Sequence, residues 1–234
     1  NPMPENPMSA ERTRFGPRLL AAMEEHGPLC VGIDPHPTLL ASWDLPDSPG
    51  GLSRFCEAVL ASVGGRVAAV KPQSAFFERH GAAGLAVLER LLADLRSAGT
   101  LSVLDVKRGD VGSTMAAYAE AYLADDAPLA ADAITITPYL GVGALVPALD
   151  LASATGRGVF VLVLTSNPEA GVVQHAGDPS VARAVAEDLA GRNARQDPVG
   201  DVGMVVGATV GDAPRLLGID LAAVNGIVLA PGVG

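Results

Sequence analysis

The sequence predicts an α/β protein built around a parallel sheet, and three observations support this class. Short apolar runs alternate with segments of helical periodicity along the chain. Each run is apolar on both faces, which is typical of strands that are covered on both sides. Polar residues, glycine or proline follow nearly every run. The sequence therefore predicts repeated strand–helix–strand units whose strands all run in one direction.

Seven apolar runs are expected to form the strands, in order along the chain. They are rich in Val, Ile and Leu and are six to eight residues long, within the usual range for buried strands. They cover residues 29–34, 67–72, 101–106, 132–137, 158–165, 202–209 and 226–231.

Four segments between these runs carry apolar residues on a single helical face. In the first, apolar residues recur at i, i+3, i+4, i+7, i+8 and i+11, the spacing of an amphipathic helix. The four segments are Leu52 to Val63, Leu85 to Leu95, Met115 to Tyr122, and Val181 to Leu189. We expect them to cover the sheet.

Two segments show no periodicity. Residues 1–10 are rich in Pro and Asn and are expected to be a disordered lead or a vector-derived remnant. Residues 191–203 contain Pro198 and several glycines, and they are expected to form a surface loop.

The position of the polar residues favours a barrel over an open, doubly wound sheet. An open sheet gathers ligands at one switch point, whereas a (β/α)₈ TIM barrel brings the carboxyl ends of all its strands to one mouth. Polar residues, glycine or proline lie at the carboxyl end of nearly every run: Asp34, Lys71, Asp105 and Lys107, Thr137, Ser166, Thr209 and Pro231. We therefore expect residues 11–234 to form a single TIM-barrel domain. Strand eight and its helix are absent from the given sequence, which we expect to be C-terminally incomplete.

Composition limits the classes of function. The net charge of −10 argues against a nucleic-acid or anionic-membrane surface, because such surfaces are basic. Cys30 and Cys56 are expected to be buried thiols rather than a disulfide framework, as in a reducing compartment. The sequence has no apolar run of membrane-spanning length and no signal-peptide pattern, so a cytoplasmic location is expected.

Lysine is rare in this chain. Of the 16 basic residues, 14 are arginines, and Lys71 and Lys107 are the two lysines. An ammonium is a compact charge that can give up a proton, whereas a guanidinium remains protonated. The two positions that kept lysine are therefore candidates for chemistry that arginine cannot perform.

The stretch "LSVLDVKRGDVGSTM" concentrates charge at the end of the third run. Residues two apart in a strand face the same side, so Asp105 and Lys107 are expected to point together into the barrel mouth. Lys71 ends the preceding run and is expected to reach Asp105. With Asp110 on the following loop, these side chains would form an alternating Lys–Asp–Lys–Asp row. A simple ion pair at a strand end is the alternative, with Ser113 or Thr114 as the N-cap of the next helix.

The charge row favours acid catalysis over a structural ion pair. Burying paired charges is often no more stabilising than burying apolar residues, so an alternating row in a cavity is better explained by catalytic electrostatics. Carboxylates on both sides would keep Lys107 protonated, which suits a general acid better than a Schiff-base nucleophile. Arg108 is expected to face outward as a structural charge.

At this level of detail the chain resembles the orotidine 5′-phosphate decarboxylase family, in its longer bacterial branch. The resemblance covers about residues 29–234. It is carried by the D-x-K-x-x-D pattern of "LDVKRGDVGST" and by "VGIDPHP", "VKPQSAFFE", "TSNPE" and the terminal "APGVG", in this order.

The resemblance implies a role for each matching residue. Lys107 would protonate C6 of the pyrimidine as CO₂ leaves, with Asp105 against the substrate carboxylate. Lys71 and Asp34 would bind the ribose hydroxyls, with Lys71 also orienting Asp105. Ser166 would bind the amide edge of the pyrimidine. The remaining substrate-binding positions are Pro231, Gly232 and Gly234, of which Pro231 would line the ring pocket.

The resemblance also implies a homodimer without a metal or organic cofactor. Asp110 and Thr114 would reach into the active site of the neighbouring subunit. The family follows "PGVG" with a phosphate-binding loop and an Arg on strand eight, and neither is in the given sequence. A protein ending at Gly234 is therefore expected to be nearly inactive.

Three other functions fit parts of the pattern. A related decarboxylase of sugar-acid phosphates shares the charged strand but uses Mg²⁺ and a further acidic ligand. A Schiff-base aldolase would use Lys71 or Lys107 as its nucleophile. A non-catalytic barrel would only bind a nucleotide or a partner.

Overall fold

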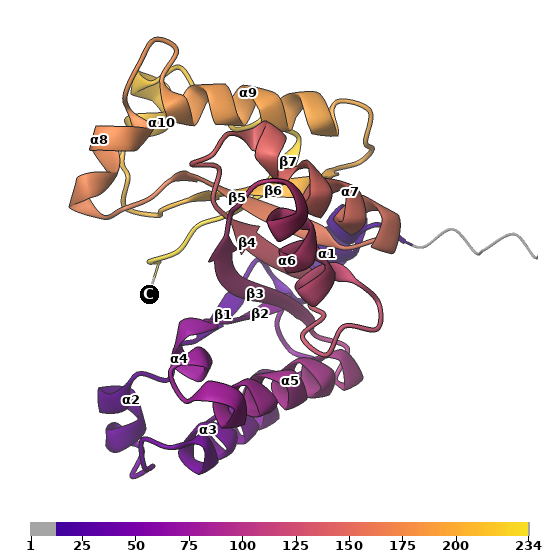
Figure 1. The fold of residues 1–234 in the computed structure, drawn as a ribbon, viewed down its shortest axis with the longest axis vertical. Helices are drawn as coiled ribbons and strands as arrows, with labels where there is room; N and C mark the ends of the chain where they lie inside the picture. The colour runs from indigo at the N-terminus through magenta and orange to yellow at the C-terminus, as the bar shows by residue number, and fades with distance from the viewer. Residues whose placement is uncertain (1–12, 234) are drawn as a thin grey trace, which may run out of the picture.

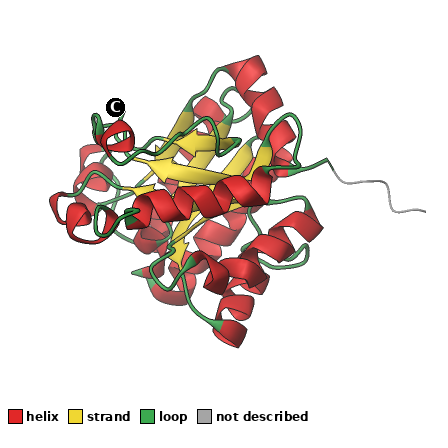
Figure 2. Cartoon of the chain, turned by 90° about the horizontal axis from the view of Figure 1, so that it is seen from above, coloured by secondary structure: helices red, strands yellow, loops and turns green. Residues whose placement is uncertain are grey.

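The computed structural model describes residues 13–233, in which seven parallel strands form one curled sheet (Figures 1 and 2). The strands follow chain order across the sheet, and the described β1 and β7 do not pair with each other. All seven predicted strands are confirmed as a half-barrel. Their bounds are β1 Cys30–Ile33, β2 Ala69–Pro72, β3 Leu101–Arg108, β4 Ala133–Ile136, β5 Gly158–Leu164, β6 Gly200–Val206 and β7 Gly226–Leu229. The predicted lead at residues 1–10 and the final Gly234 lie outside the described residues.

Helices connect successive strands and cover the outside of the sheet, as Figure 1 shows with α3 and α5 below the strands and α9 above them. The four predicted helices correspond to α3, α5, α6 and α9. The helices and 3₁₀ turns are α1 Phe15–His26, α2 Pro37–Ser42, α3 Pro49–Val63, α4 Ala75–Glu78, α5 Gly81–Ser97, α6 Gly112–Leu123, η1 Val142–Leu145, α7 Val146–Thr155, η2 Pro168–Ala170, α8 Gly171–Gln174, α9 Val181–Asn193 and α10 Ala213–Leu216.

The predicted loop at residues 191–203 was too long. Helix α9 continues to Asn193 and β6 begins at Gly200, so the loop is confined to residues 194–199. The buried amide of Asn193 donates to the carbonyls of Val202 and Val224 at 2.7 and 2.9 Å, which ties the helix end to the sheet. A Cβ at position 200 would lie 2.1 Å from this amide, so the glycine there permits the close approach.

The predicted N-cap of α6 was also wrong. The helix begins at Gly112, the N-cap position is Val111, and neither Ser113 nor Thr114 caps it. Gly112 has a φ of +54°, which lets the chain turn into the helix before either hydroxyl residue is reached.

The sheet separates two apolar clusters. Strand β4 illustrates the arrangement, because Ile134 and Ile136 pack outward into the cluster beneath the helices, while Ala133 packs inward. The inner cluster includes Phe15 and Leu19 of α1 together with Phe160 of β5.

Helix α1 is positioned at the amino-terminal ends of the strands. The N–H of Gly16 donates to the carboxylate of Asp201 at 2.8 Å, and Arg18 pairs with Asp132 at 2.8 Å. This packing leaves the opposite end of the half-barrel, where the strands end, available for a site. Within residues 13–233, no helix combines the length and apolar character needed to cross a membrane.

Candidate functional site

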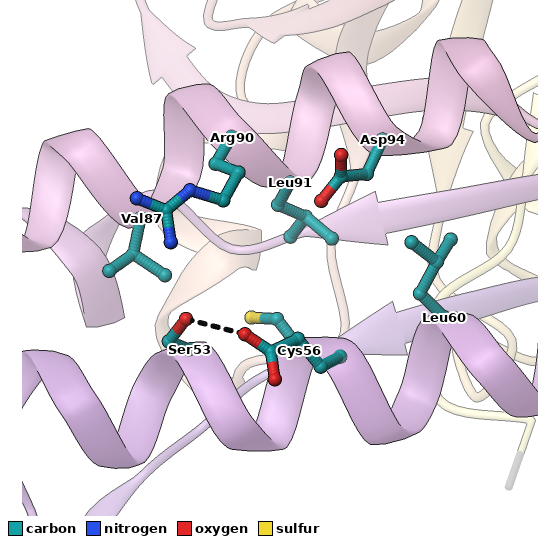
Figure 3. A pocket seen from close by; sticks show the side chains of 8 residues that line it. Ser53, Cys56, Leu60, Val87, Arg90, Leu91 and Asp94 are labelled. Atoms are coloured by element: carbon teal, nitrogen blue, oxygen red, sulfur yellow. Dashed lines mark hydrogen bonds between the residues drawn. The ribbon is translucent and has the colours of Figure 1, made fainter.

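Two hollows among residues 13–233 differ greatly in size. A crevice between α3 and α5, lined by Cys56 and Leu91 among others, has a volume of about 10 Å³ (Figure 3). This is at the lower limit for a single water molecule. The second hollow has a volume of about 960 Å³ and lies on the inner side of the sheet. Only the larger one can hold an organic substrate.

The large cavity brings together most of the predicted site residues. It is lined by Asp34, Lys71, Asp105, Lys107, Ser166, Pro231 and Gly232, which come from the carboxyl ends of five different strands or the segments just beyond them. Asp110 and Thr114 do not line it. Gly234 lies outside the described residues.

Asp105 is the centre of the charged group in this cavity. Its side chain is 8% exposed, and its two oxygens face different ammonium groups. Lys107 Nζ lies 2.7 Å from Oδ1, and Lys71 Nζ lies 3.2 Å from Oδ2. The expected contact between the ends of β2 and β3 is therefore present, with one carboxylate bridging both lysines of the chain.

The fourth member of the predicted row is not part of this group. Asp110 makes no ion pair with Lys71 or Lys107 in this chain, and its carboxylate accepts the N–H of Val111 at 2.8 Å. Of the two carboxylates expected beside Lys107, only that of Asp105 pairs with it within this chain.

The surroundings of Asp105 favour its ionised form. Burial raises its pKa, but the charge of Lys71 and the hydrogen bonds from Lys107 and Thr135 lower it by more. The pKa of Asp105 therefore lies below its usual range, and the group is a carboxylate at neutral pH.

Sequence reasoning missed two residues of the site. Thr135 of β4 donates its hydroxyl to Asp105 Oδ1 at 2.7 Å, and Gln73 accepts from Lys71 Nζ at 3.4 Å. Thr137, the polar residue expected at the end of this strand, follows β4 and does not line the cavity, whereas Thr135 does. The two-residue period of a strand predicts Thr135 as a site residue, because Thr135 faces the same side of β4 as the inward Ala133.

Lys107 does not have ordinary strand geometry. Its φ is +46°, and the register between β3 and β4 shifts between Leu104 and Arg108. The two-residue alternation of side chains, which predicts a shared face for Asp105 and Lys107, therefore does not hold at this point of β3. The two side chains meet because the irregular backbone and the long lysine side chain bring the ammonium to the carboxylate.

Arg108 faces away from the cavity, as predicted. Its guanidinium lies 2.7 Å from Glu78 of α4 and over the rings of Tyr118 and Tyr122 of α6. It thereby links two helices next to the end of β3.

The segments after β5 and β7 complete the rim of the cavity. Ser166 is exposed and lies between Thr165 and Asn167, whose side chains hydrogen-bond to each other at 2.6 Å. The carbonyl of Pro231 accepts the N–H of Ala208 at 2.9 Å, which fixes the chain after β7 against the chain after β6.

Neither cysteine ionises readily in this fold. Cys30 and Cys56 are free thiols, and burial raises their pKa to about 11 and about 12. Cys56 is buried, as predicted, whereas Cys30 is half-buried and lines the cavity. Within residues 13–233, no group of three His, Cys, Asp or Glu side chains is arranged to hold a metal ion.

Comparison with known proteins agrees with this geometry. Residues 27–234 match the model of the orotidine 5′-phosphate decarboxylase / HUMPS family. A protein of Salinispora arenicola named orotidine 5′-phosphate decarboxylase is 59% identical over 94% of this chain and 79% of its own length. One of the same name from Streptomyces coelicolor is 57% identical, with the same coverage.

Solved structures are similar as well. A crystal structure from Streptomyces avermitilis, assigned as an orotidine 5′-phosphate decarboxylase, is 54% identical with a TM-score of 0.92. It is matched over 98% of this chain and 80% of its own length. The OMP decarboxylase of Leishmania donovani is 32% identical with a TM-score of 0.76, over 94% of this chain and 80% of its own.

Proposed function

Because this chain belongs to the orotidine 5′-phosphate decarboxylase family, we propose that it converts orotidine 5′-phosphate to UMP and CO₂ in pyrimidine biosynthesis. The observation that carries the mechanism is the carboxylate of Asp105 held between the ammonium groups of Lys107 and Lys71, at 2.7 and 3.2 Å. A cytoplasmic location is proposed with it, in keeping with two free thiols.

The proposed reaction needs one proton donor. The bond between C6 and the carboxylate carbon breaks, CO₂ leaves, and the electron pair stays on C6. The Lys107 ammonium then gives a proton to C6 and becomes a neutral amine, which solvent reprotonates. A positive charge already fixed beside C6 stabilises the developing negative charge without reorganisation during the reaction.

Asp105 has two proposed roles. It lies against the carboxylate of the bound substrate, and it keeps the Lys107 ammonium directed toward C6. The buried position and low pKa of Asp105 support both roles, because the group carries its charge before substrate enters.

The other cavity residues are proposed to bind substrate. Lys71 and Asp34 bind the ribose hydroxyls, and Lys71 also orients Asp105 through the 3.2 Å contact. Ser166 contacts the amide edge of the pyrimidine. The terminal segment, with Pro231, Gly232 and Gly234, completes the substrate pocket, and Pro231 lines the ring. The position of all but Gly234 on the cavity wall supports this assignment.

We also propose a homodimer in which Asp110 and Thr114 complete the partner's site. Neither residue lines the cavity of its own chain. Exposed apolar residues follow the same two neighbouring strands: Val111 follows β3, and Tyr139 and Leu140 follow β4, with exposures of 56%, 75% and 52%. Large apolar side chains exposed to this extent support an interface at this end of the half-barrel.

The test follows the absorbance change of orotidine 5′-phosphate with the full-length gene product, in the presence and absence of EDTA. We expect turnover that EDTA does not change and a loss of at least about 100-fold in kcat for Lys107→Ala, since a general acid contributes about 10²–10⁴-fold. Nucleotide binding should persist in Lys107→Ala. Arg215→Ala is the control, because Arg215 is an exposed cation on α10.

Each alternative predicts a different result. Absence of turnover would refute the proposed function, and loss of turnover in EDTA would indicate the metal-dependent relative. A borohydride-trapped adduct on Lys71 or Lys107 would indicate Schiff-base chemistry. Unchanged turnover in Lys107→Ala would refute the role of Lys107 as the acid.

A further inference from the structure

Thr135 occupies an unusual place in the wall of the half-barrel. It is a polar residue in β4, only 1% exposed, and it lies on the inward face of the strand. The next inward residue toward the amino-terminal end is Ala133, which belongs to the apolar inner cluster. A hydroxyl in this position needs hydrogen-bond partners, because an unpaired buried hydroxyl is destabilising.

The hydroxyl of Thr135 connects the two central residues of the charged site. It accepts the backbone N–H of Lys107 at 3.0 Å and donates its own proton to Asp105 Oδ1 at 2.7 Å. The hydroxyl has one proton, so these two bonds have opposite and fixed directions. Oδ1 also accepts the Lys107 ammonium at 2.7 Å, so Thr135 closes a ring that contains both the backbone and the side chain of Lys107.

The β3–β4 register explains why a hydroxyl is needed at this position. Leu104 pairs with Ile134, and Arg108 pairs with Ile136. Three residues of β3, Asp105 to Lys107, therefore lie opposite the single residue Thr135. Such a bulge interrupts the regular ladder of backbone hydrogen bonds. The Thr135 side chain takes the place of a ladder carbonyl for the N–H of Lys107.

The bulge also places Lys107 in a conformation that non-glycine residues rarely adopt. Its φ of +46° lies in the left-handed region. Residues in this region are kept there by the surrounding structure and are common at functional sites. The hydrogen bond from Lys107 N–H to Thr135 is one of the contacts that keeps the backbone in this conformation.

We propose that Thr135 is a positioning residue for the decarboxylation, holding the Lys107 backbone in its left-handed conformation and the Asp105 carboxylate in a fixed orientation. The inference rests on the proposed function. Thr135 acts through Lys107 and Asp105, so it affects the rate of the chemical step more than the binding of substrate.

The experiment compares Thr135→Val and Thr135→Ser in the full-length gene product. Valine keeps the shape and branching of threonine without the hydroxyl, whereas serine keeps the hydroxyl. We expect kcat to fall about 10- to 100-fold in Thr135→Val, the effect of a small misplacement of a catalytic group, with KM changed less than about threefold. Thr135→Ser should keep kcat within about threefold of the parent protein.

Thr100→Val is the matched control. Thr100 is also a buried threonine, 3% exposed, and its hydroxyl accepts the N–H of Gly65 at 2.7 Å. It lies before β3, at the opposite end of the strand from Lys107. We expect Thr100→Val to lower Tm and to leave kcat unchanged.

The possible outcomes separate this inference from the proposed function. If Lys107→Ala is inactive but Thr135→Val keeps the parent kcat, the role of Thr135 is refuted and the proposed function stands. A Thr135→Ser variant as slow as Thr135→Val would assign the loss to packing and would also refute the inference.

If Thr135→Val does not fold, Thr135→Ala provides the same comparison with a smaller side chain. A parent protein without turnover refutes the proposed function, and a crystal structure of Thr135→Val then decides the inference by whether Lys107 keeps its positive φ.

Discussion

Asp105 is the residue on which the charges of the site converge. A buried carboxylate alone would have a raised pKa, but two ammonium groups and the Thr135 hydroxyl reverse this effect. Breaking such a group by removing one partner leaves a buried charge uncompensated. The three charges therefore depend on one another, although a well-packed apolar group could be equally stable.

The lowered pKa of Asp105 predicts how stability depends on pH. Because the folded-state pKa is depressed, the stabilisation from ionised Asp105 is fully present above the unfolded-state value of about 4 and is lost as pH falls through the folded-state pKa. We expect the free energy of unfolding of the parent protein, relative to Asp105→Asn, to be constant from pH 7 to pH 5. Below about pH 4 this difference should decrease.

Urea unfolding of both proteins from pH 3 to pH 7 measures this difference. Asp212→Asn is the control, since Asp212 is an exposed carboxylate paired with Arg215 on the surface. A difference between parent and Asp105→Asn that stays constant down to pH 3 would contradict the depressed pKa.

At the scale of elements, helix α1 contributes to stability, whereas the carboxyl ends of the strands and the loops that follow them carry the chemistry. Helix α1 packs at the amino-terminal ends of β4 to β6 through Phe15, Gly16 and Arg18, while the charged residues lie at the carboxyl ends. Barrels commonly divide stability and chemistry between their two ends in this way. Substitutions in α1 should therefore lower the free energy of unfolding and leave kcat unchanged.

Phe15→Ala tests this division. The Phe15 ring is 2% exposed and contacts Phe160 edge to face, with ring centroids 5.9 Å apart. We expect the substitution to reduce the free energy of unfolding by about 3–5 kcal/mol, because it leaves a cavity in the inner cluster. The fraction that remains folded should keep the parent kcat.

Denaturant unfolding and steady-state kinetics together check this expectation. Leu216→Ala is the control, because Leu216 is 72% exposed and its truncation should change stability by no more than about 0.5 kcal/mol. A Phe15→Ala protein with parent stability, or with a large loss in kcat, would show that α1 is not confined to a structural role.

At the scale of the whole molecule, the proposed dimer can be tested by mixing two inactive variants. Lys107→Ala retains Asp110, and Asp110→Ala retains Lys107. In a mixed dimer, one site would carry both substitutions and the other would carry neither. Random pairing should then restore about a quarter of the parent activity, since half of the dimers are mixed and each has one intact site.

Coexpression of the two variants, followed by kinetics and sedimentation, provides the measurement. Lys107→Ala coexpressed with Lys107→Arg is the control, because no pairing of these variants restores a lysine. Absence of recovered activity from dimers that sedimentation shows to be mixed would mean that Asp110 serves its own chain.

The fold class and the polar residues at the strand ends of the cavity follow from the sequence alone. Alternating apolar runs and helical faces are local patterns, and parallel strands must bring their carboxyl ends to one edge. This rule predicts Lys71 beside Asp105, and the two side chains are 3.2 Å apart. The rarity of lysine identified both ammonium groups, and strand-end position identified Asp34, Ser166 and Pro231.

The details that depend on how β3 pairs with its neighbours follow from the fold and not from any local pattern. The left-handed backbone of Lys107 and the bulge opposite Thr135 arise from pairing between strands that are far apart in sequence, so no local pattern in residues 101–108 reveals them. The same holds for Asn193, whose amide extends α9 and shortens the predicted loop by bonding to β6. Local periodicity determines which element forms, whereas the partner of each buried polar group is decided by the packing of the whole chain.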